Sequence, residues 1–346
     1  MTQSHSPRQV ALELAVALRD EVAPQLGGHA GRAHTGAGEG GDITFAIDEH
    51  AEAFMERFLA ERAPDIAFYS EDRGLVAPAG RAEWVLVVDP IDGTRPAMAG
   101  FEGACVSVAV APLAAERDAP LDAEREALKG EGEAGNLDSG PSAKAIYSGP
   151  RMGDVQTGCV VEIKSGRAFV AERGGGADPA PSLSQNRDVS RMFWAYGLRG
   201  RPVRAIAEVL GELIDASSVG GATFDLGSAT YDMTRILTGQ LDAYIEPGSR
   251  IIADVPGMRE EFERVGGGVV LNNSPYDLAA AALILEESGA VVSDAYGESL
   301  ASRPMLGSGH EFQFSCVAAA NPELHAAIVR ELDAGIERLG QRFLSM

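Results

Sequence analysis

The chain has 346 residues, of which 45% are hydrophobic and 23% charged, and its formal net charge at pH 7 is −22. This composition is typical of a globular protein long enough for one large domain or two ordinary ones, and the negative charge argues against nucleic acid as the main partner, because nucleic acids are bound by basic surfaces. No apolar run approaches the roughly 20 residues that cross a bilayer, and the N-terminus does not read as a signal peptide, so we expect a cytoplasmic protein without membrane contact.

Helices and strands are predicted in sequence along the first half of the chain. Ser6 followed by Pro7 indicates a helix start, with the serine as N-cap and the proline in the first turn. The glycine-rich segment 27–42 cannot pack a core and is expected to be a flexible loop. A short extended segment then leads into a second amphipathic helix within 42–64. Strands are predicted in 65–74, 83–94, 104–113, 143–149, 158–166 and 167–177, and the spacing of the last three is typical of hairpins.

Residues 114–142 interrupt this pattern, because they are acidic, rich in glycine and proline, and poor in large apolar residues. We expect an exposed insertion there. The proline- and serine-rich stretch 177–186 is the best candidate for a domain boundary, which divides the chain into halves of residues 1–185 and 186–346. Helices and strands alternate in the second half, which favours an α/β arrangement. The predicted elements lie in 201–216, 228–240, 241–248, 274–290, 291–298, 314–320 and 321–339.

The segment EWVLVVDPIDGT carries the strongest chemical signal. Its apolar run predicts a strand covered on both faces, and Pro90 and Gly93 favour a tight turn at the end of that strand. We expect the turn to bring Asp89, Asp92 and the Thr94 hydroxyl into one small volume. Carboxylates held together repel each other unless a cation lies between them, and hard oxygen ligands suit Mg²⁺ or Mn²⁺. The segment therefore predicts a divalent metal site.

The hexapeptide DPIDGT also resembles a signature of the inositol monophosphatase superfamily, which includes fructose-1,6-bisphosphatases and 3′-phosphoadenosine-5′-phosphate phosphatases. Further segments resemble motifs of the same family, in the same order, along nearly the whole chain. They are DITFAID ending at Asp48, SED at 70–72, GSA at 227–229, DAYIEPG with Glu246, and SPYDLAAAALILEESGA with Asp277. The resemblance implies an α/β (α+β) fold, a layered αβαβα sandwich with the active site in the crevice between an N-terminal half with a mainly antiparallel sheet and a C-terminal α/β half.

The resemblance implies a set of site residues as well. About two or three Mg²⁺ ions, with Mn²⁺ as an alternative, would be held by carboxylates and one carbonyl oxygen. These ligands are Glu71, Asp89, Ile91, Asp92 and Asp277. Thr94, partnered by Asp48 and assisted by Glu71, would orient or deprotonate the attacking water. The substrate would be contacted by Asp92, Gly93, Thr94, Gly227, Ser228, Ala229 and Glu246.

Taken one at a time, several of these residues have simpler explanations. Asp48 is placed to cap the helix that follows it, and Asp277 precedes an apolar helix whose N-terminus favours negative charge. Glu71 alone would be interpreted as an acid in a surface loop, and Glu246 as a turn residue before Pro-Gly. Only the ordered set of motifs favours a shared site over these interpretations.

Two departures from the family pattern leave the substrate open. The family usually continues DGT with Thr-Asn-Phe, whereas this chain has Arg95-Pro96-Ala97, and residues 249–273 intervene before Asp277 where the family has only a few residues. We expect this second insertion to form a lid or a specificity wall. The leading hypothesis is a Mg²⁺-dependent phosphatase that hydrolyses inositol monophosphate or a sugar phosphate by attack of a metal-activated water.

Other hypotheses stay open. Within the same reaction class they are a fructose-1,6-bisphosphatase and a 3′(2′),5′-bisphosphate nucleotidase. From another class, the chain would be a non-catalytic relative that binds metal or a phosphorylated metabolite. The resemblance also implies a homodimer, and it gives a small phosphorylated metabolite as the partner.

Overall fold

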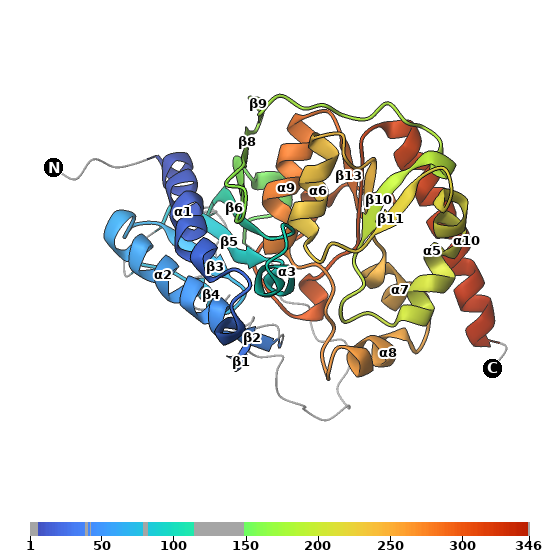
Figure 1. Cartoon of the computed structure of the whole chain (residues 1–346), viewed down its shortest axis with the longest axis horizontal. Coiled ribbons are helices and arrows are strands. Elements are labelled where there is room, and N and C mark those ends of the chain that lie inside the picture. The colour runs from blue at the N-terminus through green and yellow to red at the C-terminus, as the bar shows by residue number, and fades with distance from the viewer. Residues whose placement is uncertain (1–5, 39–40, 42, 79–81, 114–148, 345–346) are drawn as a thin grey trace.

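A seven-stranded sheet forms the centre of the first half of the chain (Figure 1). The computed structural model describes residues 6–38, 41, 43–78, 82–113 and 149–344. The insertion predicted at 114–142 lies outside these ranges, as does the strand predicted at 143–149 apart from its final glycine.

The strands of this sheet lie in the order β4-β3-β5-β6-β7-β8-β9. β3 and β5 run parallel, and every other neighbouring pair is antiparallel, including the predicted β7–β8 hairpin. The strands are β3 Ala67–Ser70, β4 Gly74–Val76, β5 Trp84–Asp92, β6 Cys105–Pro112, β7 Thr157–Glu162, β8 Ala168–Glu172 and β9 Gly176–Asp178.

Helices α1 (Pro7–Val22) and α2 (Ala46–Arg62) cover one face of this sheet (Figure 1). The Ser6 hydroxyl accepts a hydrogen bond from the N–H of Gln9, so the predicted N-cap is confirmed. Apolar residues of both helices pack against one face of β5, β6 and β7, while residues that alternate with these along the strands face the other side of the sheet. β5 is therefore buried on both faces, as its apolar run predicted.

Helices α6 (Ala229–Leu237) and α9 (Pro275–Glu287) pack on the opposite face and separate the first sheet from a second one. This second sheet has the order β11-β10-β12-β14-β13, with β11, β10 and β12 parallel and the other pairs antiparallel. Its strands are β10 Phe193–Tyr196, β11 Ala222–Phe224, β12 Ala243–Glu246, β13 Val291–Ser293 and β14 Cys316–Ala319.

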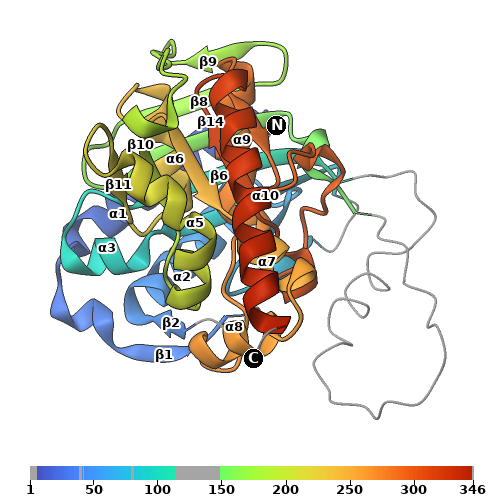
Figure 2. The ribbon, with the colours of Figure 1, turned by 90° about the vertical axis from the view of Figure 1, so that its right-hand side faces the viewer.

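Helices α5 (Val203–Ser217) and α10 (Pro322–Leu344) cover the outer face of the second sheet (Figure 2). Helix, sheet, helix, sheet and helix layers thus follow one another, and the predicted αβαβα sandwich is confirmed. The two sheets lie on either side of the boundary predicted at 185, although α6 and α9 of the second half pack on the first sheet. The division into two domains stays a prediction.

The glycine-rich segment was wrongly predicted as a loop without regular structure. Within it, β1 (His34–Ala37) pairs antiparallel with β2 (Ile43–Phe45). All residues of β1 are exposed, so β1 depends on its backbone hydrogen bonds to β2. Phe45, at the end of β2, is buried in the core beside α1 and α2. Strands β10 and β11 were not predicted either, because both are short.

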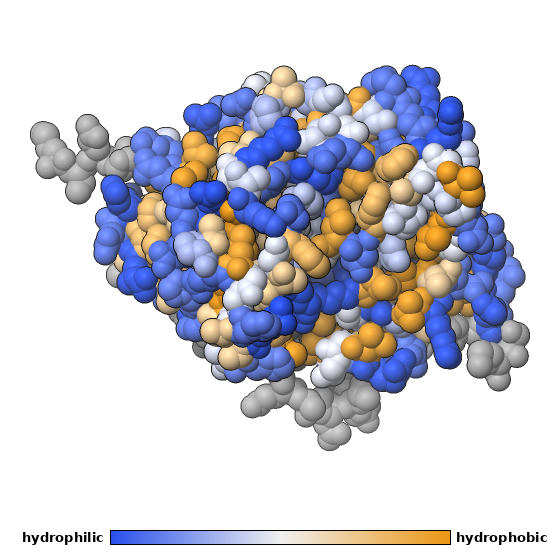
Figure 3. Space-filling view, in the orientation of Figure 1, coloured by the Kyte–Doolittle hydropathy of each residue, from blue (hydrophilic) through white to orange (hydrophobic). Residues whose placement is uncertain are grey.

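The second insertion, residues 249–273, contributes two short helices, α7 (Gly248–Asp254) and α8 (Met258–Val265). Another short helix, α3 (Thr94–Ala99), follows β5 directly. Among the described residues no helix has both the length and the apolar character needed to span a membrane. The face seen in Figure 3 carries apolar residues in separate groups between hydrophilic ones.

Candidate active site

A β-bulge at the end of β5 aims the two aspartates of DPIDGT at the same side of the sheet. Asp89 is paired with Ser107 and Asp92 with Cys105, so three steps along β5 oppose two steps along β6. In a regular strand, residues three positions apart point to opposite faces, and one extra residue reverses this. Both carboxylates are nearly buried, with 4% of Asp89 and 7% of Asp92 exposed.

Gly93 makes the turn that follows the bulge. Its φ angle is +93°, which side-chain-bearing residues rarely adopt, and an added Cβ would lie 2.3 Å from the carbonyl oxygen of Gly103. The chain can therefore turn directly from β5 into α3, and Thr94 becomes the first residue of that helix.

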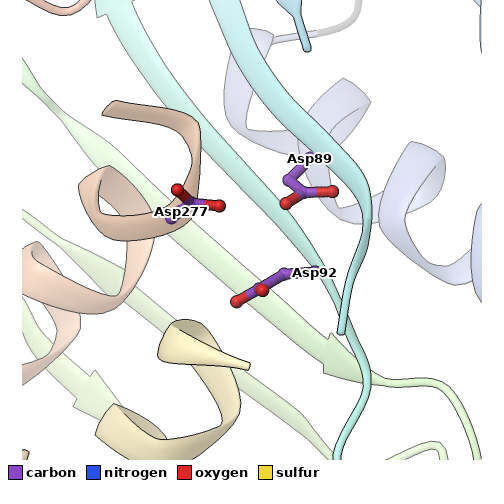
Figure 4. Close-up of side chains that lie close together, drawn as sticks. All are labelled: Asp89, Asp92 and Asp277. Atoms are coloured by element: carbon purple, nitrogen blue, oxygen red, sulfur yellow. The ribbon is translucent and has the colours of Figure 1, made fainter. Parts of the chain in front are cut away.

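Asp277 completes an acidic cluster from the opposite side of the pocket (Figure 4). It lies in the first turn of α9, where its Oδ2 accepts a hydrogen bond of 2.6 Å from the N–H of Ser274. Ligand oxygens of Asp89, Asp92 and Asp277 all lie within 4.8 Å of one another. The structure thus brings together three of the predicted metal ligands, two from the first half of the chain and one from the second.

The three carboxylates repel one another when they are ionised. Burial, followed by repulsion from Asp92 and Asp277, raises the pKa of Asp89 well above its usual value. Burial and repulsion from Asp92 raise the pKa of Asp277 to about 7. Burial also raises the pKa of Asp92, but hydrogen bonds from the Thr230 N–H (2.6 Å) and the Ser228 hydroxyl (2.9 Å) oppose this. An all-oxygen acidic set of this kind fits Mg²⁺ or Mn²⁺.

Thr94 and Asp48 form a hydrogen-bonded pair beside this cluster. The Thr94 hydroxyl lies 2.9 Å from Oδ1 of Asp48 and 3.2 Å from the carbonyl oxygen of Ile91. The other carboxylate oxygen of Asp48 accepts a hydrogen bond of 3.0 Å from the N–H of Phe45 at the start of α2. Asp48 therefore caps its helix and orients Thr94 at the same time, so the two interpretations of this residue are compatible.

Glu71 lines the same pocket but lies outside the three-carboxylate group. It follows β3, and its neighbour Asp72 accepts a hydrogen bond of 2.7 Å from the Thr44 hydroxyl. Ser70, on the other side, donates to the buried carboxylate of Glu52 on α2. Hydrogen bonds to α2 and to Thr44 of β2 thus hold the loop that carries Glu71.

Replacing Glu52 by glutamine should remove a pH-dependent loss of stability. The pKa of Glu52 is raised to about 8, from 4.5 in the unfolded chain, and burial is the largest cause of this shift. Between these values the native protein binds one proton more than the unfolded chain, so the free energy of unfolding falls as pH rises through this window. We expect Glu52→Gln to match the wild type at pH 4.5 and to exceed it by roughly 2–4 kcal/mol at pH 8.5.

Urea unfolding of the metal-free protein at a series of pH values measures this effect. Glu61→Gln, at an exposed position of the same helix, should follow the wild-type curve. Parallel curves for Glu52→Gln and the wild type would show that Glu52 is ionised throughout and that its hydrogen bonds outweigh burial.

The predicted substrate-binding residues take different places around the pocket. Gly227 lines it directly, and Ser228 and Ala229 line its continuation toward the second sheet. The Ser228 hydroxyl is occupied in donating to Asp92. Glu246 is fully buried behind the wall, where its Oε1 accepts hydrogen bonds from Arg201 (2.8 Å) and from the N–H of Gly248.

Two arginines that lie at the pocket, Arg199 and Arg201, were not identified from the sequence. Arg199 lines both the pocket and its continuation, and its charge lowers the pKa of both Asp92 and Asp277 against the larger effect of burial. Arg201 is buried and donates to Glu246 and to the carbonyl oxygen of Arg199, which fixes the backbone there. The sequence YGLRGR after an apolar stretch was the signal that could have indicated them.

The second insertion contributes to the walls of the site, as its predicted position near the pocket suggests. Leu271 and Asn272 line both the pocket and its continuation. An added Cβ at Gly41 would lie 2.6 Å from a methyl group of Val269, so the β1–β2 hairpin packs closely on the insertion. A function as a lid or specificity wall stays a prediction.

The chain is an αβαβα sandwich with an acidic pocket that is lined by residues from both of its halves. The model of the inositol monophosphatase family matches residues 6–115 and 150–337, and the chain belongs to this family.

Proteins that are similar to this chain in sequence have different names. The chain is 25% identical over 333 residues to a fructose-1,6-bisphosphatase/inositol-1-monophosphatase of Methanothermobacter thermautotrophicus, covering 94% of this chain and 95% of that one. It is 23% identical over 300 residues to a putative Nus factor SuhB of Neisseria meningitidis, with coverage of 85% and 86%. The solved structure of an IMPase of Thermotoga maritima matches with a TM-score of 0.61 at 16% identity, over 95% of this chain and 97% of that one.

Proposed function

We propose that the protein is a Mg²⁺-dependent phosphatase that hydrolyses a small phosphate monoester, with an inositol or sugar phosphate as the leading substrate class. One observation carries the proposal: three mutually repelling carboxylates share a pocket with a threonine hydroxyl that is already hydrogen-bonded to a carboxylate. A purely structural acidic cluster would gain nothing from the Thr94–Asp48 pair beside it.

The cation would be held by the carboxylates of the cluster, by Glu71 and by the Ile91 carbonyl. Bound Mg²⁺ supplies charge neutralisation for the phosphoryl group and makes a bound water more acidic. The Ile91 carbonyl oxygen faces Thr94, and Asp277 faces β5 across the pocket, so ligands approach from two sides. Phosphoryl transfer requires mainly positioning and charge stabilisation, and this pocket offers both.

The residues of this chain then have distinct tasks. Asp48 accepts the proton of the Thr94 hydroxyl, which leaves the threonine oxygen free to orient a water and take its proton. The backbone N–H groups of Gly93 and Thr94, at the turn after β5, would contact the phosphate. In-line attack of the water then releases the alcohol and inorganic phosphate without a covalent intermediate.

A non-catalytic function is the second candidate, because several relatives are named Nus factors or putative Nus factors. Such a function would need neither the buried carboxylates, whose ionisation is opposed by burial and mutual repulsion, nor the Thr94–Asp48 pair. The negative charge of −22 is also unfavourable for a direct contact with nucleic acid. These observations favour catalysis on a small metabolite.

Phosphate release from a panel of substrates tests the proposal. We expect Mg²⁺-dependent release from myo-inositol 1-phosphate or a sugar phosphate, weaker release from 3′-phosphoadenosine 5′-phosphate, and none in EDTA, because the pocket lacks the charge balance to act without a cation. Mn²⁺ should restore activity after EDTA treatment. A folded protein that releases no phosphate from any compound with either metal would contradict the proposal.

A further inference from the structure

The pocket has two lobes that meet at the metal cluster. Thr94 and Asp48 line only the first lobe, whereas Asp225 and Asp232 line only the second. Both lobes share the cluster residues Asp92 and Asp277, together with Arg199, Gly227, Leu271 and Asn272. A phosphate at the cluster would therefore have the water-orienting pair on one side and the second lobe on the other.

In-line displacement assigns a task to the second lobe. The attacking and leaving oxygens lie roughly opposite each other across the phosphorus atom. If the water approaches from the side of Thr94 and Asp48, the leaving group departs into the second lobe. The side chains that line only this lobe are then the ones that contact the leaving group, and this step rests on the proposed function.

Asp232 stands out among these side chains. It lies in the first turns of α6 and is only 1% exposed, yet it lines the second lobe. Its Oδ1 has no hydrogen-bond partner among the described residues. The nearby Arg235 donates from its two terminal nitrogens to Glu162 and Gln240. Its Nε also lacks a partner among the described residues and makes no hydrogen bond to this oxygen. Buried polar atoms are nearly always paired, so an unmet carboxylate oxygen in a pocket wall indicates a missing ligand or water.

The charges of the second lobe favour hydroxyl groups over a second phosphate. Arg201 forms an ion pair with Glu246. Arg199 lies where the two lobes meet, so its positive charge is shared with the phosphate position at the cluster. Asp225 and Asp232 would both face a second anion in this lobe, and their carboxyl groups are complementary to neutral hydroxyls. Burial, then repulsion from Asp92, raises the pKa of Asp232 well above its usual value.

We propose that Asp232 is a specificity-determining residue that exchanges a hydrogen bond with a hydroxyl of the leaving group, so that the enzyme selects phosphate monoesters of polyhydroxylated compounds. A site built to bond a hydroxyl discriminates strongly against an analogue without one, because its own polar group is then left unpaired. Glu246 is not placed to make this contact, because it lines neither lobe, although its Oε2 also lacks a partner among the described residues. The Ser228 hydroxyl already donates to Asp92.

The test compares two substrates of the same ring size, myo-inositol 1-phosphate and cyclohexyl phosphate, with Mg²⁺. We expect the wild type to prefer the hydroxylated compound in kcat/KM by about 100-fold or more, and Asp232→Asn to lower this preference by about tenfold or more. Asp215→Asn, at an exposed position of α5, is the matched control and should leave the preference unchanged. A preference that Asp232→Asn leaves intact would overturn the inference.

Two further measurements decide the remaining cases. If Asp232→Asn does not fold, the contact can be tested in the wild type with monodeoxy analogues of inositol phosphate. Equal kcat/KM values across the series would contradict a hydroxyl contact. If no compound releases phosphate, the proposed function fails, and binding then decides the inference. Myo-inositol 1-phosphate should raise the melting temperature more than cyclohexyl phosphate does in the wild type, but not in Asp232→Asn; equal shifts in both proteins would overturn it.

Discussion

Asp89→Asn should abolish Mg²⁺-dependent phosphate release and at the same time stabilise the metal-free protein. Loss of a buried anionic ligand should lower kcat by roughly 10³-fold or more, because charge stabilisation is the main source of catalysis in phosphoryl transfer. Without metal, the same change removes the carboxylate whose ionisation is opposed by burial, Asp92 and Asp277. The melting temperature in EDTA at pH 8 should rise by a few degrees, which corresponds to about 1–2 kcal/mol.

The sign of the stability effect depends on pH and on metal. A carboxylate whose native pKa is raised destabilises the protein as pH rises above its unfolded value, so the gain should be largest at pH 8 and vanish toward pH 4. Excess Mg²⁺ should stabilise the wild type but much less the variant. Asp65→Asn, an exposed acid before β3, is the control and should change neither property. A variant that is less stable than the wild type in EDTA would contradict the repulsion that we infer.

Asp48→Asn should lower kcat by about 10²–10⁴-fold while Mg²⁺ binding is retained. In the wild type one carboxylate oxygen accepts from the Phe45 N–H and the other from the Thr94 hydroxyl. The asparagine carbonyl can satisfy only one of these donors. If it keeps the helix cap, its NH₂ group faces Thr94 and donates a hydrogen bond instead of accepting one. The threonine hydroxyl then cannot deliver a proton in that direction, and the water loses its base.

Kinetics of Thr94 variants provide the matched comparison. Thr94→Ser keeps the hydroxyl and should retain most activity, whereas Thr94→Ala should lose as much as Asp48→Asn. Because the two side chains act as one unit, the double variant Asp48→Asn/Thr94→Ala should be little worse than either single variant. Additive losses would show that the two groups act independently. Thermal stabilisation by Mg²⁺ should be similar in all four proteins, since neither side chain belongs to the three-carboxylate cluster.

The parts of the fold that local pattern controls could be predicted from the sequence. Ser6 and Pro7 define a helix start through neighbouring atoms alone, and the apolar run of β5 requires burial on both faces wherever the strand lies. The layered fold came from the ordered motifs and not from periodicity, since alternation alone does not give the order of strands in a sheet. Strand β1 was missed because its residues carry no apolar pattern, and backbone pairing leaves no signal in side-chain type. Its partner β2 lies in the segment that was predicted to be extended.

The site residues that lie in a single turn could be predicted from the sequence. The orientation of a side chain that is set by a contact with a distant residue could not. Asp89 and Asp92 are neighbours in sequence, whereas Glu246 is drawn from the pocket wall by Arg201, 45 residues away. No local feature of DAYIEPG indicates that partner. Asp232 was missed for a similar reason, because a polar residue within an apolar helix is usually a surface position unless the pocket beside it is known.

The bulge in β5 has a consequence for how this chain tolerates change in length. The two aspartates face one way only because β5 holds one residue more than β6 opposes, so losing a single residue between them would turn one carboxylate away while every motif letter but one survived. Substitution at the connecting positions is a milder event than deletion. Variation in length among such chains should therefore occur elsewhere. The segment that holds α7 and α8 is a suitable place, because it lies outside β5 and does not affect the spacing of the two aspartates.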